Sequence, residues 1–401
     1  MNIAIVTPDS LQYANWGGVG TIANHLSKLL ASRGHHVFFF TYSKLPVQTK
    51  TTRYKSGKIS IIPVASDQIF LNNLLPYTSF AYSWNKALAP TFDKVHRRHP
   101  IAVIHSTSLH APGIFIATKH HHIPIILHDQ GLQRHTNPFQ RSSIDLYLKS
   151  LFDEYFIRFY PQRIVACSDY EQKLLVDTLP KVSAKTTVVP NFLIDTTKYQ
   201  NKQKLNINNL VYFGRLETRK GVDILLKAFQ SLALKNSDLR LYLIGSSSQT
   251  FKHNGRLIDF KDYLKSLNLS RSISKRITVK SHIKNRVDLI KYLASIKGLA
   301  VFPAKHEPFG YVMIEAMAMG FIPLASRFTG AIQHIKSGNN GFIITPNYKK
   351  LAKIIELVQK MPQIRLTSIS NQSQETVTRH YSATAVTKPY QSIYHQLKLK
   401  L

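Results

Sequence analysis

Residues 298–326 read GLAVFPAKHEPFGYVMIEAMAMGFIPLAS, and this stretch decides the fold class. Its two ends, GLAVFPA (298–304) and IPLAS (322–326), are short apolar runs with the length and composition of buried strands. The segment between them is helical in character, and its proline at 308 suits a first helical turn. A strand, a helix and a second strand in this order predict parallel strands of a sheet that helices cover on both faces.

The same alternation extends outward along the chain. Further strands are expected at 2–7, 35–42, 58–64, 101–107, 123–129, 163–168, 210–216, 239–246, 276–282 and 340–346. The stretch 188–209 is polar and has no periodicity after Asp195, so it is expected to be a linker. We therefore expect an α/β fold of two doubly wound, Rossmann-like domains that face a central cleft, 1–195 and 196–381, with a C-terminal helix over 382–401 packing back on the first domain.

Composition limits the partners and the compartment. The chain has 401 residues and a single cysteine, Cys167, which fits a reducing compartment. Its N-terminus lacks the features of a secretory signal, and no apolar run approaches the roughly 20 residues of a membrane-spanning helix. The expected place is therefore the cytoplasm, with peripheral attachment to the inner face of the cell membrane as an option. A net charge of +32 suits three partners, namely nucleic acid, an anionic membrane or a phosphorylated small molecule.

Glu307 and Glu315 are conspicuous because acids are scarce, with 21 Asp and Glu against 53 Lys and Arg. Eight helical residues rise about 12 Å, which is on the order of the distance between the two sugars of a sugar nucleotide. Glu307 could accept hydrogen bonds from a hexose and Glu315 from a ribose, with the helix N-terminus facing the phosphates. Alternatively, Glu307 has no ligand, and its carboxylate is simply stabilised by the helix dipole. Glu315 stands among apolar residues, where an unpaired charge is costly, and this favours a functional role.

Two glycine turns are candidate sites for a phosphate or another ligand. FGRLETRKGVDILLKAF (213–229) reads as a strand, a turn and a helix, with Arg215 and Lys220 beside the turn. Free backbone N–H groups and these two cations would suit a phosphate, although both cations could equally be solvated. In the first domain, Gly17 and Gly18 of NWGGVG (15–20) would let the backbone approach a ligand closely, or would simply form an ordinary turn.

The chain resembles a known family, the retaining glycosyltransferases of family four, which have the GT-B fold. The spacing E-P-F-G-x-x-x-x-E of 307–315, followed by AMAMGFIPLAS, is similar to the E-x7-E signature of that family. Other stretches match family elements in order along nearly the whole chain: GGVGTIANHLSKLLASRGHHV (17–37), ILHDQG (126–131), VACSDYEQKLL (165–175), VVPNFLIDTTKY (188–199) and YFGRLETRKGVDILLKAF (212–229).

The resemblance implies a nucleoside diphosphate sugar as donor and a set of binding and catalytic residues. Arg215 and Lys220 would bind the diphosphate and stabilise the leaving group. Glu307 and the backbone amides of Phe309 and Gly310 would hold the donor sugar.

The remaining implied roles concern the ribose, the acceptor and the catalytic histidine. Glu315 would hold the ribose, His128 would lie near the donor sugar, and Gly17 and Gly18 would lie near the phosphate and the acceptor. No D-x-D motif occurs, so no obligatory metal or other cofactor is expected. The acceptor would be a glycan or a lipid-linked glycan, as in cell-surface polysaccharide or lipopolysaccharide-type synthesis. One departure is Gln333, which stands where the family usually has an acid.

Three other stretches have simpler interpretations. The histidines of KHHHIP (119–124) are not expected to form a metal site, because adjacent histidines rarely converge on one ion. The aromatic stretch 69–92 is expected to be core, with a lipid interface through Phe80, Tyr82 and Trp84 as the alternative. The stretch 142–163 is likewise expected to be core. A basic nucleic-acid-binding protein and a non-catalytic partner subunit on the same fold stay open as alternative functions.

Overall fold

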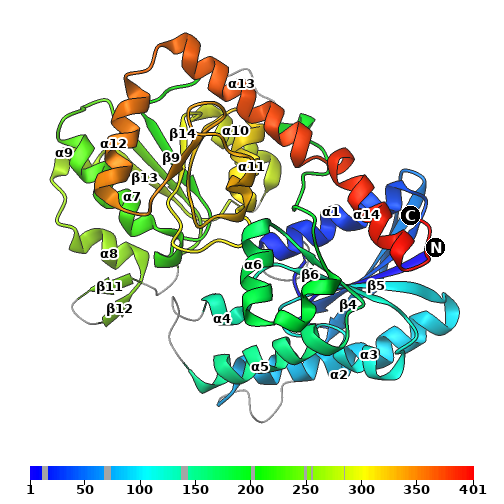
Figure 1. Cartoon of the computed structure of the whole chain (residues 1–401). Coiled ribbons are helices and arrows are strands. Elements are labelled where there is room, and N and C mark those ends of the chain that lie inside the picture. The colour runs from blue at the N-terminus through cyan, green and yellow to red at the C-terminus, as the bar shows by residue number, and fades with distance from the viewer. Residues whose placement is uncertain are drawn as a thin grey trace. The chain divides into compact units, whose positions relative to one another are not determined.

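The computed structural model describes residues 1–10, 17–66, 74–136, 143–199, 204–247, 251–253, 256–283 and 285–401. The chain divides into two compact units (Figure 1). The first, domain 1, consists of Met1–Ile194 together with Ala383–Leu401. The second, domain 2, consists of Asp195–Ser382. Residues 15 and 16 of the NWGGVG turn and the first part of the aromatic stretch 69–92 lie outside the described residues.

Domain 1 is built on an eight-stranded sheet in the order β3-β4-β2-β1-β5-β6-β7-β8. The strands are β1 (Asn2–Val6), β2 (His36–Ser43), β3 (Lys50–Tyr54), β4 (Gly57–Ala65), β5 (Ile101–Thr107), β6 (Ile125–Asp129), β7 (Arg163–Ala166) and β8 (Thr186–Val188). Neighbouring strands run parallel except β3, which pairs antiparallel with β4. Strand β3 was not predicted, because its polar sequence KTTRY is largely exposed at the sheet edge.

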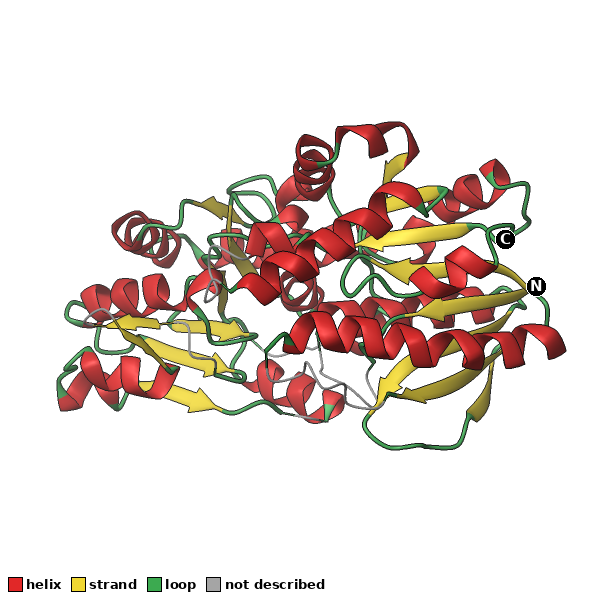
Figure 2. Ribbon diagram, turned by 90° about the horizontal axis from the view of Figure 1, so that it is seen from below, coloured by secondary structure: helices red, strands yellow, loops and turns green. Residues whose placement is uncertain are grey.

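Helices cover both faces of this sheet (Figure 2). They are α1 (Gly18–Ser32), α2 (Pro76–Arg98), α3 (Ile114–Lys119), α4 (Gln133–Thr136), α5 (Ile144–Phe159), α6 (Asp169–Thr178), the 3-10 helix η3 (Pro180–Lys185) and α14 (Ala383–Gln396). Alternating strand residues build two cores: Ile3 and Ile5 pack with α1 and α14, whereas Ala4 and Val6 pack on the face of α2 and α5. The terminal helix α14 thus completes domain 1.

Domain 2 contains a six-stranded parallel sheet in the order β13-β10-β9-β14-β15-β16. Its strands are β9 (Asn209–Phe213), β10 (Arg240–Ile244), β13 (Ile277–Lys280), β14 (Leu299–Phe302), β15 (Ile322–Ser326) and β16 (Phe342–Ile344), and a separate hairpin pairs β11 (Phe251–His253) with β12 (Arg256–Ile258). The helices are α7 (Val222–Ala233), α8 (Phe260–Ser266), α9 (Arg271–Ser274), α10 (Arg286–Ser295), α11 (Tyr311–Ala318), α12 (Tyr348–Gln359) and α13 (Gln363–His380), with 3-10 turns η4 (Thr197–Tyr199), η5 (Thr218–Lys220) and η6 (Gly330–His334). Two helix-covered sheets, parallel apart from the edge strand β3, confirm the predicted α/β class.

Three segments test their predictions in detail. The stretches 188–209 and 142–163 differ in part, whereas Trp84, Leu88 and Phe92 of 69–92 are core, as expected. The stretch 188–209 is not only a linker, since it contains η4 and the buried Tyr199. The lipid-interface alternative for 69–92 is wrong for Trp84, which is fully buried in the core of α2, and Phe80 packs against the same core. Helix α5 is core on one face only, because Tyr155, Phe159 and other apolar side chains of its outer face are exposed. None of the helices within the described ranges is long and apolar enough to cross a membrane.

Candidate functional site

The candidate site of domain 2 lies at the carboxyl ends of two adjacent strands, β9 and β14. From β9 the chain passes through α7 to β10 on one side, whereas β14 borders β9 on the other side. Such a reversal of strand order is where open α/β sheets bind ligands. The turn after β9 contains Arg215 and Lys220, and the turn after β14 contains Glu307. The topology therefore brings three predicted site residues to one point.

Gly221 fixes how closely the two turns approach each other. It adopts a left-handed conformation with φ +74° and forms the N-cap of α7. A Cβ atom there would lie 1.9 Å from the carbonyl oxygen of Pro303, which follows β14. Only glycine avoids that overlap at this φ. The backbone of the first turn therefore lies directly against the backbone of the second.

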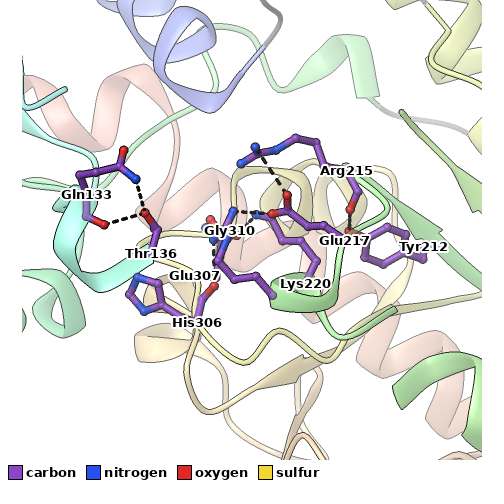
Figure 3. A network of polar contacts seen from close by, with 10 residues as sticks. Gln133, Thr136, Tyr212, Arg215, Glu217, Lys220, His306, Glu307 and Gly310 are labelled. Carbon is purple, nitrogen blue, oxygen red and sulfur yellow. Dashed lines mark hydrogen bonds and ion pairs between the residues drawn. The ribbon is translucent and has the colours of Figure 1, made fainter. Parts of the chain in front are cut away.

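Lys220 and Glu307 form an ion pair across these two turns (Figure 3). Glu307 Oε1 also accepts a hydrogen bond of 3.2 Å from the backbone N–H of Gly310, and Arg219 Nη1 lies 3.9 Å from Glu307 Oε2. Burial lowers the pKa of Lys220 well below its ordinary value, and the cations of Arg219 and Arg215 lower it further. A further anion placed here would stabilise the charged form of this amine.

Arg215 offers a more accessible cation beside this pair. Its side chain is 59% exposed, and its Nη1 lies 3.6 Å from Glu217 Oε2. Glu217 is buried and makes its shorter contact, 2.7 Å, with Arg219. Burial by itself raises the pKa of Glu217, but Arg219 and Arg215 overcome this effect and hold it below the ordinary value. Arg215 is thus held loosely enough to reach an incoming anion.

Glu315 of α11 is buried, with 2% of its surface exposed, but it is not alone. It forms an ion pair with Arg286, the first residue of α10, and accepts a hydrogen bond of 3.4 Å from the hydroxyl of Tyr199. Arg286 also donates to the Tyr199 hydroxyl at 3.1 Å. Glu315 is therefore not the unpaired charge expected from the sequence, because these partners compensate its burial, and burial alone does not imply a ligand. Neither partner lies near Glu315 in the sequence.

Phe309 and Gly310 shape the start of α11. Gly310 is its N-cap, with φ +92°, and a Cβ atom there would lie 2.6 Å from Thr329 Cγ2. The carbonyl of Phe309 accepts a hydrogen bond of 2.7 Å from the N–H of Ala331, and its ring is buried. Gln333 follows in η6, where its side chain lies 3.2 Å from the ring of His334.

A pocket that was not predicted lies beside α10, at the end of β13. It has a volume of about 500 Å³ and is lined by Val279, Lys280, Ser281, His282, Ile283, Asp288 and Tyr292. Lys280 Nζ lies 3.9 Å from the centre of the Tyr292 ring. Asp288 and Tyr292 belong to α10, the helix that also carries Arg286. In the sequence, only the expected strand at 276–282 and the helix that follows it indicated this place.

The residues predicted in domain 1 lie in two environments. Gly17 and Gly18 are exposed at the start of α1, where nothing would obstruct a Cβ atom on Gly17. His128 stands near the carboxyl end of β6 but is buried, and its Nε2 lies 2.7 Å from His105 Nδ1. Burial lowers the pKa of His128 to about 3, so its ring is neutral. Strand alternation places His128 on the face covered by α1 and α14, where it lines a small cavity together with Ile22 and His105, and its catalytic role stays a prediction.

Two family models match the chain in succession. Residues 16–197 match the family described as Glycosyltransferase Family 4, and residues 194–375 match Glycosyl transferases group 1. A capsular polysaccharide biosynthesis glycosyltransferase of Staphylococcus aureus, CapM, is 27% identical over 208 residues, which are 51% of each chain. The chain thus spans about half the length of this relative.

Solved structures resemble the chain over its whole length. A sucrose-phosphate synthase from Thermosynechococcus elongatus has a TM-score of 0.76 at 18% identity, covering 99% of both chains. An Anabaena protein in complex with UDP-glucose has a TM-score of 0.68 at 18% identity, again covering 99% of both chains. At these identities the likeness establishes the fold and nothing finer.

Proposed function

This chain belongs to family four of the glycosyltransferases, and we propose that it is a retaining enzyme that transfers a hexose from a nucleoside diphosphate sugar to a hydroxyl acceptor. The main support is the Lys220–Glu307 ion pair beside the accessible Arg215, at the point of domain 2 where ligands of such sheets bind. We further propose that 196–381 form the donor domain and 1–195 the acceptor domain.

The donor diphosphate would exchange partners with the site. As it arrives, its oxygens replace the Glu307 carboxylate at Lys220 Nζ, and Arg215 turns from Glu217 to the same charge. Glu307, released from Lys220 but still placed by the Gly310 N–H, then accepts hydrogen bonds from the hexose hydroxyls. The backbone amides at Phe309 and Gly310 lie at the same end of α11 for the sugar.

These cations do their main work as the sugar leaves the diphosphate. The charge that develops on the departing oxygen is then stabilised by Lys220 and Arg215, which is the largest contribution expected of such a site. In a front-face reaction with retention, the leaving phosphate accepts the proton of the acceptor hydroxyl. No step in this proposal requires a metal or another cofactor.

Glu315 and the pocket beside α10 would hold the nucleoside. The Glu315 carboxylate would accept hydrogen bonds from the ribose hydroxyls, while Arg286 and Tyr199 hold its orientation. The base then enters the pocket that Asp288 and Tyr292 line on the same helix.

The acceptor and the place of work are proposed on broader grounds. We propose a cell-surface polysaccharide or a lipid-linked, lipopolysaccharide-type glycan, in line with the capsular relative. The net charge of +32 and the exposed apolar face of α5 favour peripheral attachment to an anionic membrane, on its cytoplasmic face.

Donor binding is tested by a thermal-shift screen with UDP-, GDP- and ADP-sugars, followed by transfer or donor hydrolysis with the purified protein. We expect one nucleotide class to raise the melting temperature, and Glu315→Gln to weaken that donor about tenfold or more, because hydrogen bonds to a charged group contribute about 1.5–3 kcal/mol. The matched control is Glu356→Gln, on the exposed part of α12 beside Lys235. If Glu315→Gln binds the donor like the wild type, the site is wrongly assigned. Steeply salt-dependent RNA binding without any sugar-nucleotide binding would favour the nucleic-acid alternative instead.

A further inference from the structure

Three histidines gather on domain 1 at the edge of the sheet opposite to its ligand-binding edge. His96 lies in the last turn of α2, His120 directly follows α3, and His122 lies in the turn before β6. One ring nitrogen of each lies within 4.8 Å of the other two. The ring centres are 5.1 Å apart for His96 and His120, and 5.9 Å for His120 and His122.

We propose that His96, His120 and His122 form a binding site for one borderline transition-metal cation, with Zn²⁺ as the representative ion. Imidazole nitrogens are the ligands that Zn²⁺, Ni²⁺ and Cu²⁺ share. Zinc–nitrogen bonds of about 2.0–2.1 Å in a tetrahedron require nitrogens about 3.3 Å apart. Each ligating nitrogen must therefore move roughly an ångström toward a common centre. The exposed side chain of His122 can rotate to allow this.

An outer partner already orients one of the three rings. His120 Nε2 lies 2.7 Å from Asp93 Oδ1 on α2, so this nitrogen donates its proton to the carboxylate and Nδ1 is left for the ion. A carboxylate behind a histidine ligand is the usual arrangement at metal centres, where it fixes the ring and raises its basicity. Asp93 is held in turn by Lys119.

Binding has one structural cost, and it lies at His96. Nδ1 of His96 accepts a hydrogen bond of 3.0 Å from the backbone N–H of Ile101, at the start of β5. If Nε2 of His96 binds the ion, the proton of the neutral ring must be on Nδ1. Nδ1 can then no longer accept from the Ile101 N–H, because both groups are donors. The ion therefore breaks this hydrogen bond, and His96 rotates away from Ile101. The Ile101 amide is thus a local reporter of occupancy.

This site is structural rather than catalytic. It lies at the amino ends of β5 and β6, whereas ligands of parallel sheets bind at the carboxyl ends. A bound ion would tie the end of α2 to the α3–β6 turn and stabilise domain 1. The sequence pointed away from a metal because it displayed only adjacent histidines. His96 stands 24 residues earlier, and only the packing of α2 beside α3 adds it.

The test uses the full chain without a histidine tag, titrated with Zn²⁺ against a chromophoric chelator. We expect one tightly bound equivalent, and at least tenfold weaker binding in each of His96→Gln, His120→Gln and His122→Gln. The matched control is His121→Gln, because His121 is exposed between two ligands but does not belong to the cluster. Its affinity should change less than twofold.

Two further measurements use the wild type alone, so they do not depend on whether a variant folds. In the wild type, Zn²⁺ should shift the Ile101 amide resonance and speed its hydrogen exchange, whereas Mg²⁺, which prefers oxygen ligands, should not. Co²⁺, with a water molecule as the fourth ligand beside the three histidines, should give the intense visible bands of a four-coordinate site. Equal loss in His121→Gln and His122→Gln, no stoichiometric binding, or an unchanged Ile101 amide on binding would each overturn it.

Discussion

At the scale of single residues, the acids of domain 2 hold the cations that a donor would need. Glu307 pairs with Lys220, Glu315 pairs with Arg286, and Glu217 holds Arg219 closely and Arg215 loosely. Each carboxylate keeps a cation in place at the carboxyl edge of the sheet without an incoming ligand. The scarcity of acids in this basic chain therefore makes those few positions informative.

Lys220→Met should lower the turnover of sugar transfer by about a hundredfold or more while the fold is retained, since loss of one preorganised donor at developing charge typically has that effect. Initial rates with a saturating donor measure it, and circular dichroism checks the fold. Lys235→Met is the matched control, because that lysine is exposed and pairs only weakly with Glu356. Equal turnover in the two variants would remove Lys220 from the mechanism.

A buried acid of domain 1 makes stability depend on pH. Burial raises the pKa of Glu171, at the start of α6, to about 8 from 4.5. The folded state therefore keeps this proton to a higher pH than the unfolded state, so the contribution is full below pH 4.5 and is lost as pH rises through about 8. Glu171→Gln should remove a slope of about 1.4 kcal/mol per pH unit within that window.

Urea unfolding of the wild type and Glu171→Gln at several pH values measures this difference, and the variant should gain on the wild type as pH rises from 5 to 8. Burial lowers the pKa of histidines such as His105 and His128, and they contribute to the pH dependence with the opposite sign. This contribution is common to the wild type and the variant, so it cancels in their difference. Asp177→Asn, on the exposed part of the same helix, should leave the profile unchanged. Parallel profiles for wild type and Glu171→Gln would contradict the assignment.

At the scale of elements, the contact between the β9 and β14 turns depends on one glycine. Gly221→Ala should destabilise domain 2 by several kcal/mol and abolish donor binding, because the new methyl group overlaps the Pro303 carbonyl in addition to the strain of positive φ. Gly338→Ala is the matched control, since it also has positive φ, +80°, but open space around the Cβ position. Thermal unfolding distinguishes them, and equal losses would show that strain alone operates.

Helix α5 exposes apolar side chains on its outer face, which a purely internal helix would bury. The exposed apolar side chains on it are Ile144, Tyr147, Leu148, Leu151, Tyr155 and Phe159. Their spacing of three, four and seven residues places several of them on one side of the helix. The triple variant Leu151→Ser, Tyr155→Ser, Phe159→Ser should reduce co-sedimentation with anionic vesicles about tenfold or more. Ile364→Ser, at an isolated exposed isoleucine of α13, should not, and equal binding of both would exclude α5 as the contact.

At the scale of the whole molecule, the charge of +32 acts over all elements at once. Binding to vesicles that contain anionic lipid should therefore weaken strongly between about 0.05 and 0.5 M salt, as the Debye length shortens well below 10 Å. Vesicles of neutral lipid alone should bind little at either salt concentration. Salt-independent binding to both would mean that the apolar face acts without the charge.

The sequence by itself determined the α/β class, the strands around the candidate site, the turn positions of Arg215, Lys220 and Glu307, and the position of Glu315 within a helix. These features are local, because strand and helix periodicity and turn residues are written in consecutive positions. The exposed strand β3 was missed for the same reason, since its alternation has no apolar face.

Tertiary structure alone decided the partners. It paired Glu315 with Arg286 and Tyr199, turned His128 toward His105 in the interior, and brought His96 to His120 and His122. Each of these contacts joins residues that are 23 or more positions apart, except within the histidine turn itself. Such contacts depend on which elements lie side by side in the sheet order, and no periodicity within a short window of sequence records that order.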